Sequence, residues 1–356
     1  MDEAAVLERL VRRYSPSGAE GPAVAEFVRL ARGLGYATHA DRVGNGVATV
    51  GRGRPRVLFL GHIDTVEGDR PVARRRGRVH GRGAVDAKGP LAAALGAGIG
   101  FRGPGSYRVV AAVGEETDSR GARHLARGPA PDAVIVGEPS GWDGVTVGYK
   151  GDLRFAAEFR RPRTHWGSPY PTAADLAVGW VGRLRAVVES RAGPSPFRSP
   201  GAKLVGFASD PSADPEVARL QFDVRLPPGL STAELLAELP AEPLRPRVRT
   251  TVRIEAFETG RSDPVVRALE EGIRAAGGRP TLWRKSGTSD LNVVGPAWGL
   301  GGAAYGPGDA RLDHTSRESV SVAELRRSVR VLRTAVRRLT ARPGDGLTPP
   351  RSAAAP

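Results

Sequence analysis

The chain has 356 residues, of which 40% are hydrophobic and 26% charged, the composition of a globular protein long enough for two domains. It contains no cysteine, which excludes disulfides, thiolate nucleophiles and cysteine-ligated zinc. Its net charge of +15 comes from 53 basic residues, of which only four are lysine, and indicates either an arginine-rich genome or an acidic macromolecular partner.

The first 20 residues have the spacing of an amphipathic helix and lack the continuous apolar stretch of a signal peptide. No later apolar run approaches the roughly 20 residues of a membrane span. We therefore expect a cytoplasmic protein with no membrane partner. Aromatic residues make up only 6% and are not interleaved with basic ones, so we expect no nucleic-acid partner either.

Helical and strand patterns alternate in the first 150 residues. Helical spacing appears at 4–14, 21–35 and 89–99, and short apolar strands appear at 56–64, 107–116 and 132–139. This alternation predicts an α/β fold, in which a mostly parallel sheet is flanked by helices.

The pattern changes after residue 150. Alternating strands at 152–160, 218–226 and 247–257 and helices at 172–191 and 232–242 predict an inserted α+β domain over 151–255. Helices at 263–277 and 319–340 then complete the first domain, which we assign to 1–150 and 256–340. The tail at 341–356 is rich in Pro, Gly and Ala, and we expect it to be disordered.

Polar residues gather at the ends of the predicted strands, where open α/β sheets bind ligands. The set comprises His62, Asp64, Asp86, Glu115, Glu116, Glu138 and His314. Histidine and carboxylates together suit zinc, cobalt or manganese. Asp64 follows His62 by two residues, so both side chains face the same way and the aspartate can accept a hydrogen bond from the second imidazole nitrogen.

Each of these features alone has a simpler interpretation. A histidine at a strand end is more often structural than a metal ligand, and adjacent glutamates are usually a solvated turn. The coincidence of five such clusters at strand ends is much harder to explain by chance. Two metal ions need about five ligands with one bridging carboxylate, and this set is large enough.

The motifs occur in the order G-H-x-D-T-V at 61–66, G-R-G-x-x-D-x-K-G at 81–89, G-E-E at 114–116 and G-E-P at 137–139, followed by a late histidine. This order resembles the M20 family of dinuclear metallopeptidases and deacylases. The resemblance implies two divalent metal ions, with zinc expected and cobalt or manganese possible. It implies that Asp86 bridges them, that His62 and Glu138 complete one site, and that Glu116 and His314 complete the other. Glu115 would be the general base, and the peptide bond after Asp86 would be cis.

The insert resembles the lid and dimerisation domain of that family, which implies a homodimer. In R-T-H-W-G-S-P at 163–169, His165 would stabilise the oxyanion, in the active site of the partner subunit. In Q-F-D-V-R-L-P-P-G at 221–229, Arg225 would bind a substrate carboxylate. A segment that matches the family's G-T-S-D element would line the substrate pocket: Lys285, Ser286, Gly287, Thr288 and Ser289.

The resemblance implies hydrolysis of a linear amide. The segments at 283–292 and 303–319 are similar to one branch of the family, which releases lysine or ornithine from the C-terminal glutamate side chain of a small acidic amino-group carrier protein. A basic enzyme would be steered toward such a carrier. Two alternatives remain: a small-molecule deacylase acting on acetylornithine or succinyl-diaminopimelate, and a non-catalytic basic binding protein on the same scaffold.

Overall fold

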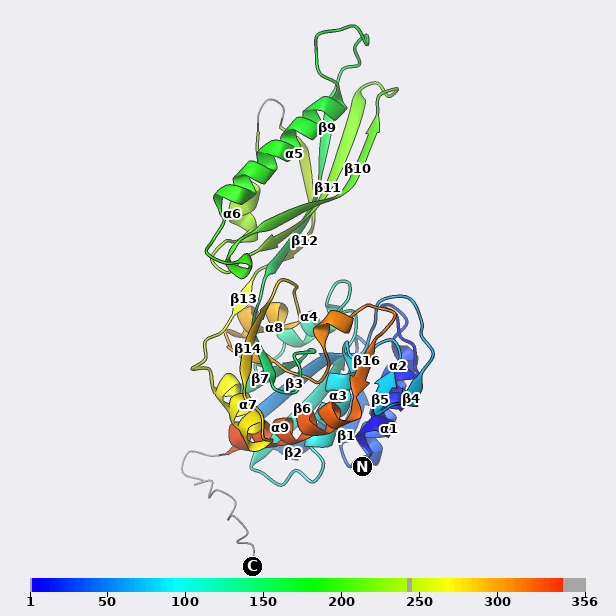
Figure 1. Ribbon diagram of the computed structural model, residues 1–356, viewed down its shortest axis with the longest axis vertical. Coiled ribbons are helices and arrows are strands. Elements are labelled where there is room, and N and C mark those ends of the chain that lie inside the picture. Colours follow the sequence, from blue (N-terminus) through cyan, green and yellow to red (C-terminus); the bar gives the residue numbers. More distant parts are fainter. Residues whose placement is uncertain (1, 242–244, 342–356) are drawn as a thin grey trace, which may run out of the picture.

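The computed structural model describes residues 2–241 and 245–341 and shows two parts joined by extended segments (Figure 1). The lower part in that view surrounds a nine-stranded sheet, and the upper part carries a four-stranded sheet. Among the described residues, no helix is both long and apolar enough to cross a membrane. The predicted disordered tail at 341–356 lies outside the described residues except for Ala341.

The lower part is built from two stretches of the chain. The first contains α1 (Glu3–Val11), α2 (Gly21–Gly33), β1 (Ala37–Ala40), β2 (Gly46–Arg52), β3 (Arg56–His62), β4 (Ala73–Arg75), β5 (Arg78–His80), α3 (Lys88–Ala97), β6 (Gly105–Ala112), α4 (Arg120–Ala126), β7 (Ala133–Gly137) and β8 (Gly144–Tyr149). The second contains β13 (Phe257–Glu258), α7 (Pro264–Ala275), β14 (Thr281–Lys285), α8 (Leu291–Trp298), β15 (Ala303–Ala304), η2 (Ala310–Leu312), β16 (Ser319–Ser321) and α9 (Val322–Thr340).

The large sheet has the strand order β1-β2-β6-β3-β7-β15-β8-β13, with β14 paired to β8. Its four central strands, β6, β3, β7 and β15, run parallel to one another, and β1, β2 and β8 are antiparallel to their inner neighbours. The predicted α/β fold with a largely parallel central sheet is therefore confirmed. The parallel arrangement brings the C-terminal ends of β3, β6 and β7 to the same edge.

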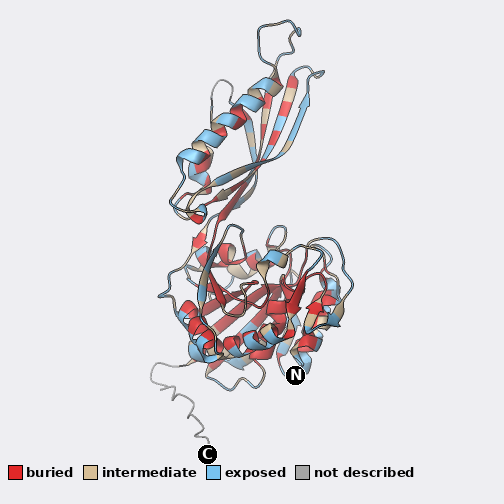
Figure 2. Ribbon diagram, in the orientation of Figure 1, coloured by how far each residue is buried: buried red, intermediate tan, exposed pale blue. Residues whose placement is uncertain are grey.

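The central strands of this sheet are buried on both faces over most of their length, as expected where helices cover a parallel sheet (Figure 2). Successive residues of β3 point to opposite faces, so Val57 and Phe59 pack in the cluster that includes α3 and α9. Leu58 and Leu60 pack in a second cluster, which includes α4 and α8.

The upper part contains β9 (Gly151–Arg161), α5 (Ala173–Ser190), η1 (Pro196–Arg198), β10 (Gly201–Asp210), β11 (Glu216–Leu226), α6 (Thr232–Ala237) and β12 (Arg247–Ile254). The four strands pair antiparallel in the order β10-β11-β9-β12, and α5 packs on this sheet. Trp180 of α5 is fully buried against three phenylalanine rings of the sheet, those of Phe155, Phe159 and Phe222. These aromatic contacts give the upper part a core of its own.

Candidate metal centre

Polar side chains lie at the C-terminal ends of three of the four central strands, β3, β6 and β7. His62 is the last residue of β3, Glu115 and Glu116 follow β6, and Glu138 follows β7. Asp86 precedes α3 and His314 follows η2, so two further segments reach the same edge.

Two groups of side chains at this edge share Asp86. In the first, Nε2 of His62 lies 3.1 Å from Oδ1 of Asp86 and 3.9 Å from Oε1 of Glu138. In the second, Nε2 of His314 lies 3.1 Å from Oδ2 of Asp86 and 3.0 Å from Oε1 of Glu116. Within each group the donor atoms all lie within 4.8 Å of one another. Asp86 therefore presents one oxygen to each histidine, as a bridging ligand would.

Burial opposes the charged form of His62, but neighbouring carboxylates favour the charged form of both histidines. Hydrogen bonds with Asp86 and Glu116 raise the pKa of His314 to about 10. Burial disfavours the charged form of Asp86, but hydrogen bonds with His314 and His62 outweigh this effect and lower its pKa. Cations are thus favoured at both positions where the donor atoms converge.

Burial favours the neutral form of two other carboxyl groups in the cluster, those of Glu138 and Glu115. Burial, aided by the charge of Asp86, raises the pKa of Glu138 to about 8. Burial also raises the pKa of Glu115 well above its usual range, and the carboxylates of Glu138 and Asp290 raise it further against the opposing charge of His62. Such a crowd of carboxylates costs free energy unless positive charge is supplied.

The orientation of His62 fits a metal ligand. Its Nδ1 lies 3.0 Å from the backbone carbonyl oxygen of Asp64, which leaves Nε2 facing the cluster. The prediction that the Asp64 carboxylate receives this bond is therefore only partly right, because Oδ1 is farther away, at 3.5 Å. Together with the shared Asp86, the donor set fits two divalent cations.

The carboxylate of Asp64 has a second task, which the sequence did not reveal. It accepts the backbone N–H groups of Glu115 and Glu116, each at 3.1 Å, and the hydroxyl of Ser17 at 2.7 Å. Asp64 is completely buried. It therefore fixes the turn that carries both glutamates.

A buried ion pair fixes the segment that carries Asp86. Oε1 of Glu318 accepts the backbone N–H groups of Val85 and Asp86 at 3.0 and 3.2 Å, and Oε2 accepts a hydrogen bond from Arg82 at 2.8 Å. The bond between Asp86 and Ala87 is cis, as the family resemblance implied. No pattern in the sequence indicated this role for Glu318.

His165 lies away from the cluster within one chain. It belongs to the segment between β9 and α5, which is at the top of Figure 1, at the end of the upper part remote from the large sheet. Its side chain is exposed, and its Nδ1 accepts the backbone N–H of Gly167 at 3.1 Å. In this arrangement, His165 does not contact the cluster of its own chain.

Arg225 is held by carboxylates of its own sheet. Its Nε and Nη2 donate to Asp223 at 2.9 and 3.0 Å, and Nη1 lies 3.4 Å from Asp152. Asp223 takes the Nε–Nη2 edge of the guanidinium, so a substrate carboxylate would have to use the Nη1–Nη2 edge, and the clamp function stays a prediction.

The predicted pocket segment begins at the end of β14. Lys285 donates to the carbonyl oxygen of Pro139, the residue after Glu138, at 2.5 Å. Ser286 and Gly287 are exposed, Thr288 is half-buried and Ser289 is buried. This segment therefore reaches the metal cluster through Lys285.

Two further carboxyl groups near the cluster were missed. Burial raises the pKa of Asp290 to about 7, and burial together with the charge of Asp86 raises that of Asp313 to about 9. Within the described ranges, Oδ1 of each is buried without a hydrogen-bond partner. Their positions in the sequence were the available signal, since Asp290 is the aspartate of the G-T-S-D element and Asp313 directly precedes His314.

Comparison with known proteins agrees with this geometry. A family model described as Peptidase family M20/M25/M40 matches residues 58–338. The chain belongs to this family of hydrolases, and its metal cluster lies within the matched region.

Similar proteins from other organisms extend over nearly the whole chain. A Deinococcus radiodurans protein named LysW-lysine hydrolase is 38% identical over 354 residues, which cover 94% of this chain and 96% of the relative. A Pyrococcus furiosus protein with the name putative LysW-lysine/LysW-ornithine hydrolase is 34% identical over 335 residues. The match covers 94% of this chain and 96% of the relative.

Solved structures of low sequence identity share the fold. The aminopeptidase PepT from Bacillus cereus superposes with a TM-score of 0.79 at 17% identity, covering 96% of this chain and 98% of the other. A Bacillus subtilis protein described as a dinuclear metal-binding peptidase of the M20 family superposes with a TM-score of 0.69 at 12% identity. The superposition covers 95% of this chain and 98% of the other. The two-part architecture is therefore shared with M20 peptidases.

Proposed function

We propose that this protein is a metal-dependent amide hydrolase that releases lysine or ornithine from the C-terminal glutamate side chain of a small acidic carrier protein. The observation that carries the proposal is the similarity, over 94% of the chain, to proteins named for LysW-linked lysine and ornithine. The net charge of +15 supports an acidic macromolecular substrate. We place the reaction in the cytoplasm, within lysine or arginine biosynthesis.

The proposed cofactor is a pair of divalent ions, zinc in the first place and cobalt or manganese as alternatives. Asp86 would bridge them, with His62 and Glu138 holding one and Glu116 and His314 the other, as the two groups of donor atoms suggest. When bound, the pair would polarise the scissile carbonyl and acidify water.

Glu115 is the proposed general base. It takes a proton from the attacking water and delivers it to the leaving α-amino group of lysine or ornithine. Burial and the neighbouring carboxylates raise the pKa of Glu115 above its usual range, which makes its carboxylate a stronger base. Asp64 supports this role because it holds the backbone N–H of Glu115 in place.

We propose that His165 stabilises the oxyanion in the partner subunit's active site, which requires a homodimer. The edge strand β10 favours such an assembly, because its outer edge pairs with no other strand among the described residues and it exposes Leu204, Val205 and Phe207. Helix α5 packs against β10, and Val178 of this helix is 62% exposed. Lys285 and the segment that follows it would line the substrate pocket, and Arg225 would bind a substrate carboxylate.

The test compares hydrolysis of carrier-linked lysine, N-acetylornithine and succinyl-diaminopimelate by the metal-loaded enzyme. We expect the carrier-linked substrate to have the highest kcat/KM, and that value to fall with ionic strength. Faster turnover of either small substrate would contradict the carrier assignment.

The Glu115→Gln variant tests the catalytic assignment separately. It should keep its metal content and lose activity by about 10²- to 10⁴-fold, as expected for removal of a general base. Full activity in this variant would show that Glu115 is not the base. Absence of hydrolysis with all three substrates, in wild-type enzyme of full metal content, would instead favour a binding protein.

A further inference from the structure

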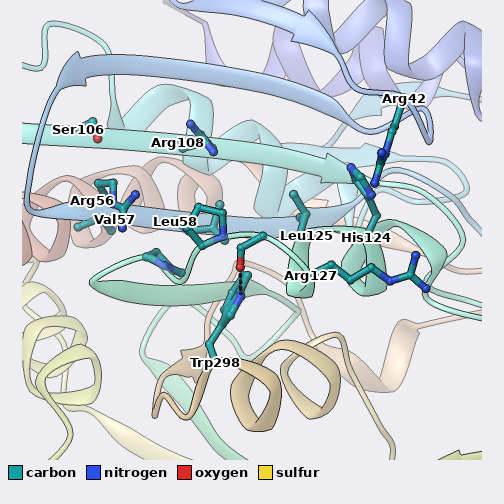
Figure 3. Close-up of a pocket in the computed structure, with 13 residues that line it drawn as sticks. Arg42, Arg56, Val57, Leu58, Ser106, Arg108, His124, Leu125, Arg127 and Trp298 are labelled. Atoms are coloured by element: carbon teal, nitrogen blue, oxygen red, sulfur yellow. Dashed lines mark hydrogen bonds between the residues drawn. The ribbon is translucent and has the colours of Figure 1, made fainter.

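A hollow of about 310 Å³ lies on the large sheet, away from the metal centre. Its floor is formed by the first residues of β3 and β6, including Arg56, Leu58 and Arg108 (Figure 3). Arg56 precedes His62 by six residues of an extended strand, which is about 20 Å. The hollow is therefore separate from the proposed active site.

The hollow exists because short helices leave part of the sheet uncovered. Leu58 and Arg108 are paired in register on the face that α4 and α8 cover. These helices have seven and eight residues and are about 10 and 12 Å long, whereas β3 and β6 extend for about 23 and 26 Å. A parallel sheet is normally buried on both faces.

Positive charge surrounds this floor. Four arginines from separate elements line the hollow, and Figure 3 shows Arg42, Arg127 and His124 at one end and Arg56 at the other. Within the stretches that the structure describes, no ion pair or side-chain hydrogen bond engages Arg42, Arg108 or Arg127.

The positive charges of the other two basic residues in the hollow, Arg56 and His124, are only partly neutralised by nearby carboxylates. Arg56 donates to the carbonyl oxygen of Ala130 at 2.8 Å, and its Nε, 3.8 Å from Asp132, is buried with no hydrogen-bond partner among the described residues. His124 lies 3.8 Å from Asp41. The lining therefore has an excess of guanidinium donors over carboxylates.

Apolar groups complete the wall. The ring of Trp298 stands beside the loop after α4, where its Nε1 donates to the carbonyl oxygen of Gly128 at 3.3 Å (Figure 3). Leu58 of the floor and Leu125 add further apolar surface to the lining. Such a surface, combined with a few polar groups that fix orientation, is typical of small-ligand pockets.

We propose that this hollow binds a small organic anion, in which a carboxylate or phosphate is joined to a flat apolar body. The arginines bind the oxyanion through paired N–H donors, and the body packs on Leu58, Leu125 and Trp298. Carboxylate and phosphate share this recognition chemistry, and the experiment separates them.

The test is isothermal titration calorimetry on the full-length, metal-loaded protein with four probes. Benzoate and phenyl phosphate carry the same ring with different oxyanions, whereas inorganic phosphate and benzyl alcohol each supply only one half of the proposed ligand. We expect benzoate or phenyl phosphate to bind with 1:1 stoichiometry, about tenfold more tightly than either half. The tighter of the two identifies the oxyanion.

The variants separate this hollow from the metal centre, which also attracts anions. Arg108→Gln combined with Arg127→Gln should weaken binding about tenfold or more, since two charge-assisted contacts are lost. Both side chains are exposed, so folding should be unaffected. The matched control is Arg279→Gln, an exposed arginine outside the hollow, and it should bind as the wild type does.

Three results would overturn the proposal. They are the absence of saturable binding by both ring-bearing anions, equal binding by the double variant and the wild type, and equal weakening by the Arg279 control. Equal binding by the double variant and the wild type would place the anion at the metal centre. Equal weakening by the Arg279 control would mean that binding depends only on the net charge of the protein.

Discussion

The carboxylate of Asp64 accepts the backbone N–H of Glu115 at 3.1 Å. Its other oxygen accepts the backbone N–H of Glu116 at the same distance. One buried side chain therefore orients both adjacent glutamates, and their side chains can take different tasks: Glu116 lies beside His314, and Glu115 is left as the proposed base.

Asp64→Asn should disturb this turn. The asparagine amide has only one oxygen, so it can accept only one of the two backbone N–H groups, and its NH₂ group would face the other. We expect kcat to fall by about 10- to 100-fold, as for other residues that orient metal ligands and their neighbours. Steady-state kinetics at full metal occupancy measures this. Asp69→Asn, which changes an exposed aspartate, is the control. An unaltered kcat in Asp64→Asn would mean that the turn does not need the carboxylate.

Glu318→Gln should weaken metal binding. It removes the charge that balances the buried Arg82 and loosens the backbone of Asp86, so we expect metal affinity to fall by about 10- to 100-fold. Leaving Arg82 unbalanced should also cost about 3–5 kcal/mol in the free energy of unfolding. Metal titration and denaturant unfolding test the two effects.

The control for Glu318 is Glu271→Gln, which breaks an exposed pair with Arg338. An exposed ion pair contributes at most about 1 kcal/mol, so this variant should bind metal normally. Equal metal affinity in both variants would refute the role of Glu318.

Trp180→Ala should destabilise the upper part selectively. The ring is buried among three phenylalanines, and its removal should cost about 3–5 kcal/mol. We expect an early unfolding transition that leaves metal binding intact, because the proposed metal ligands lie in the lower part. Trp166→Ala, which removes a ring that is 73% exposed, should change stability by no more than about 0.5 kcal/mol. Loss of metal binding in Trp180→Ala would show that the two parts unfold together.

A surface ion pair should add a small acid-dependent contribution to stability. A hydrogen bond from Arg54 lowers the pKa of Asp132. Because the folded pKa lies below the unfolded value of about 3.9, the pair stabilises the fold above that pH and loses its effect as pH falls through the folded pKa. Asp132→Asn should therefore cost less than about 1 kcal/mol at neutral pH, and the difference should vanish in strong acid. Urea unfolding at both pH values measures it, and a difference that grows as pH falls would contradict this sign.

The sequence revealed the elements whose pattern reflects burial. Buried β3, β6 and β7 stand out as apolar runs, and the polar residues after them reach one edge because the strands are parallel. It did not reveal β10, which is exposed along nearly its whole length and so lacks alternation. It also missed α8, whose short sequence contains both Gly and Pro.

Contacts between distant segments could not be read from local patterns. Glu318 acts on Asp86 across more than 200 positions, and only the fold brings the two together. Asp64 was correctly placed at the site, but its bonds with Glu115 and Glu116 depend on the pairing of β3 with β6.

The most direct test of the central claim is the intact mass of a lysine-loaded carrier after incubation with metal-loaded enzyme, with the released product identified in the same sample. If the proposed function is correct, the carrier loses the mass of one lysyl group, free lysine appears in equal amount, and Glu115→Gln leaves the carrier unchanged. A carrier that keeps its lysine in the presence of wild-type enzyme with full metal occupancy would contradict it.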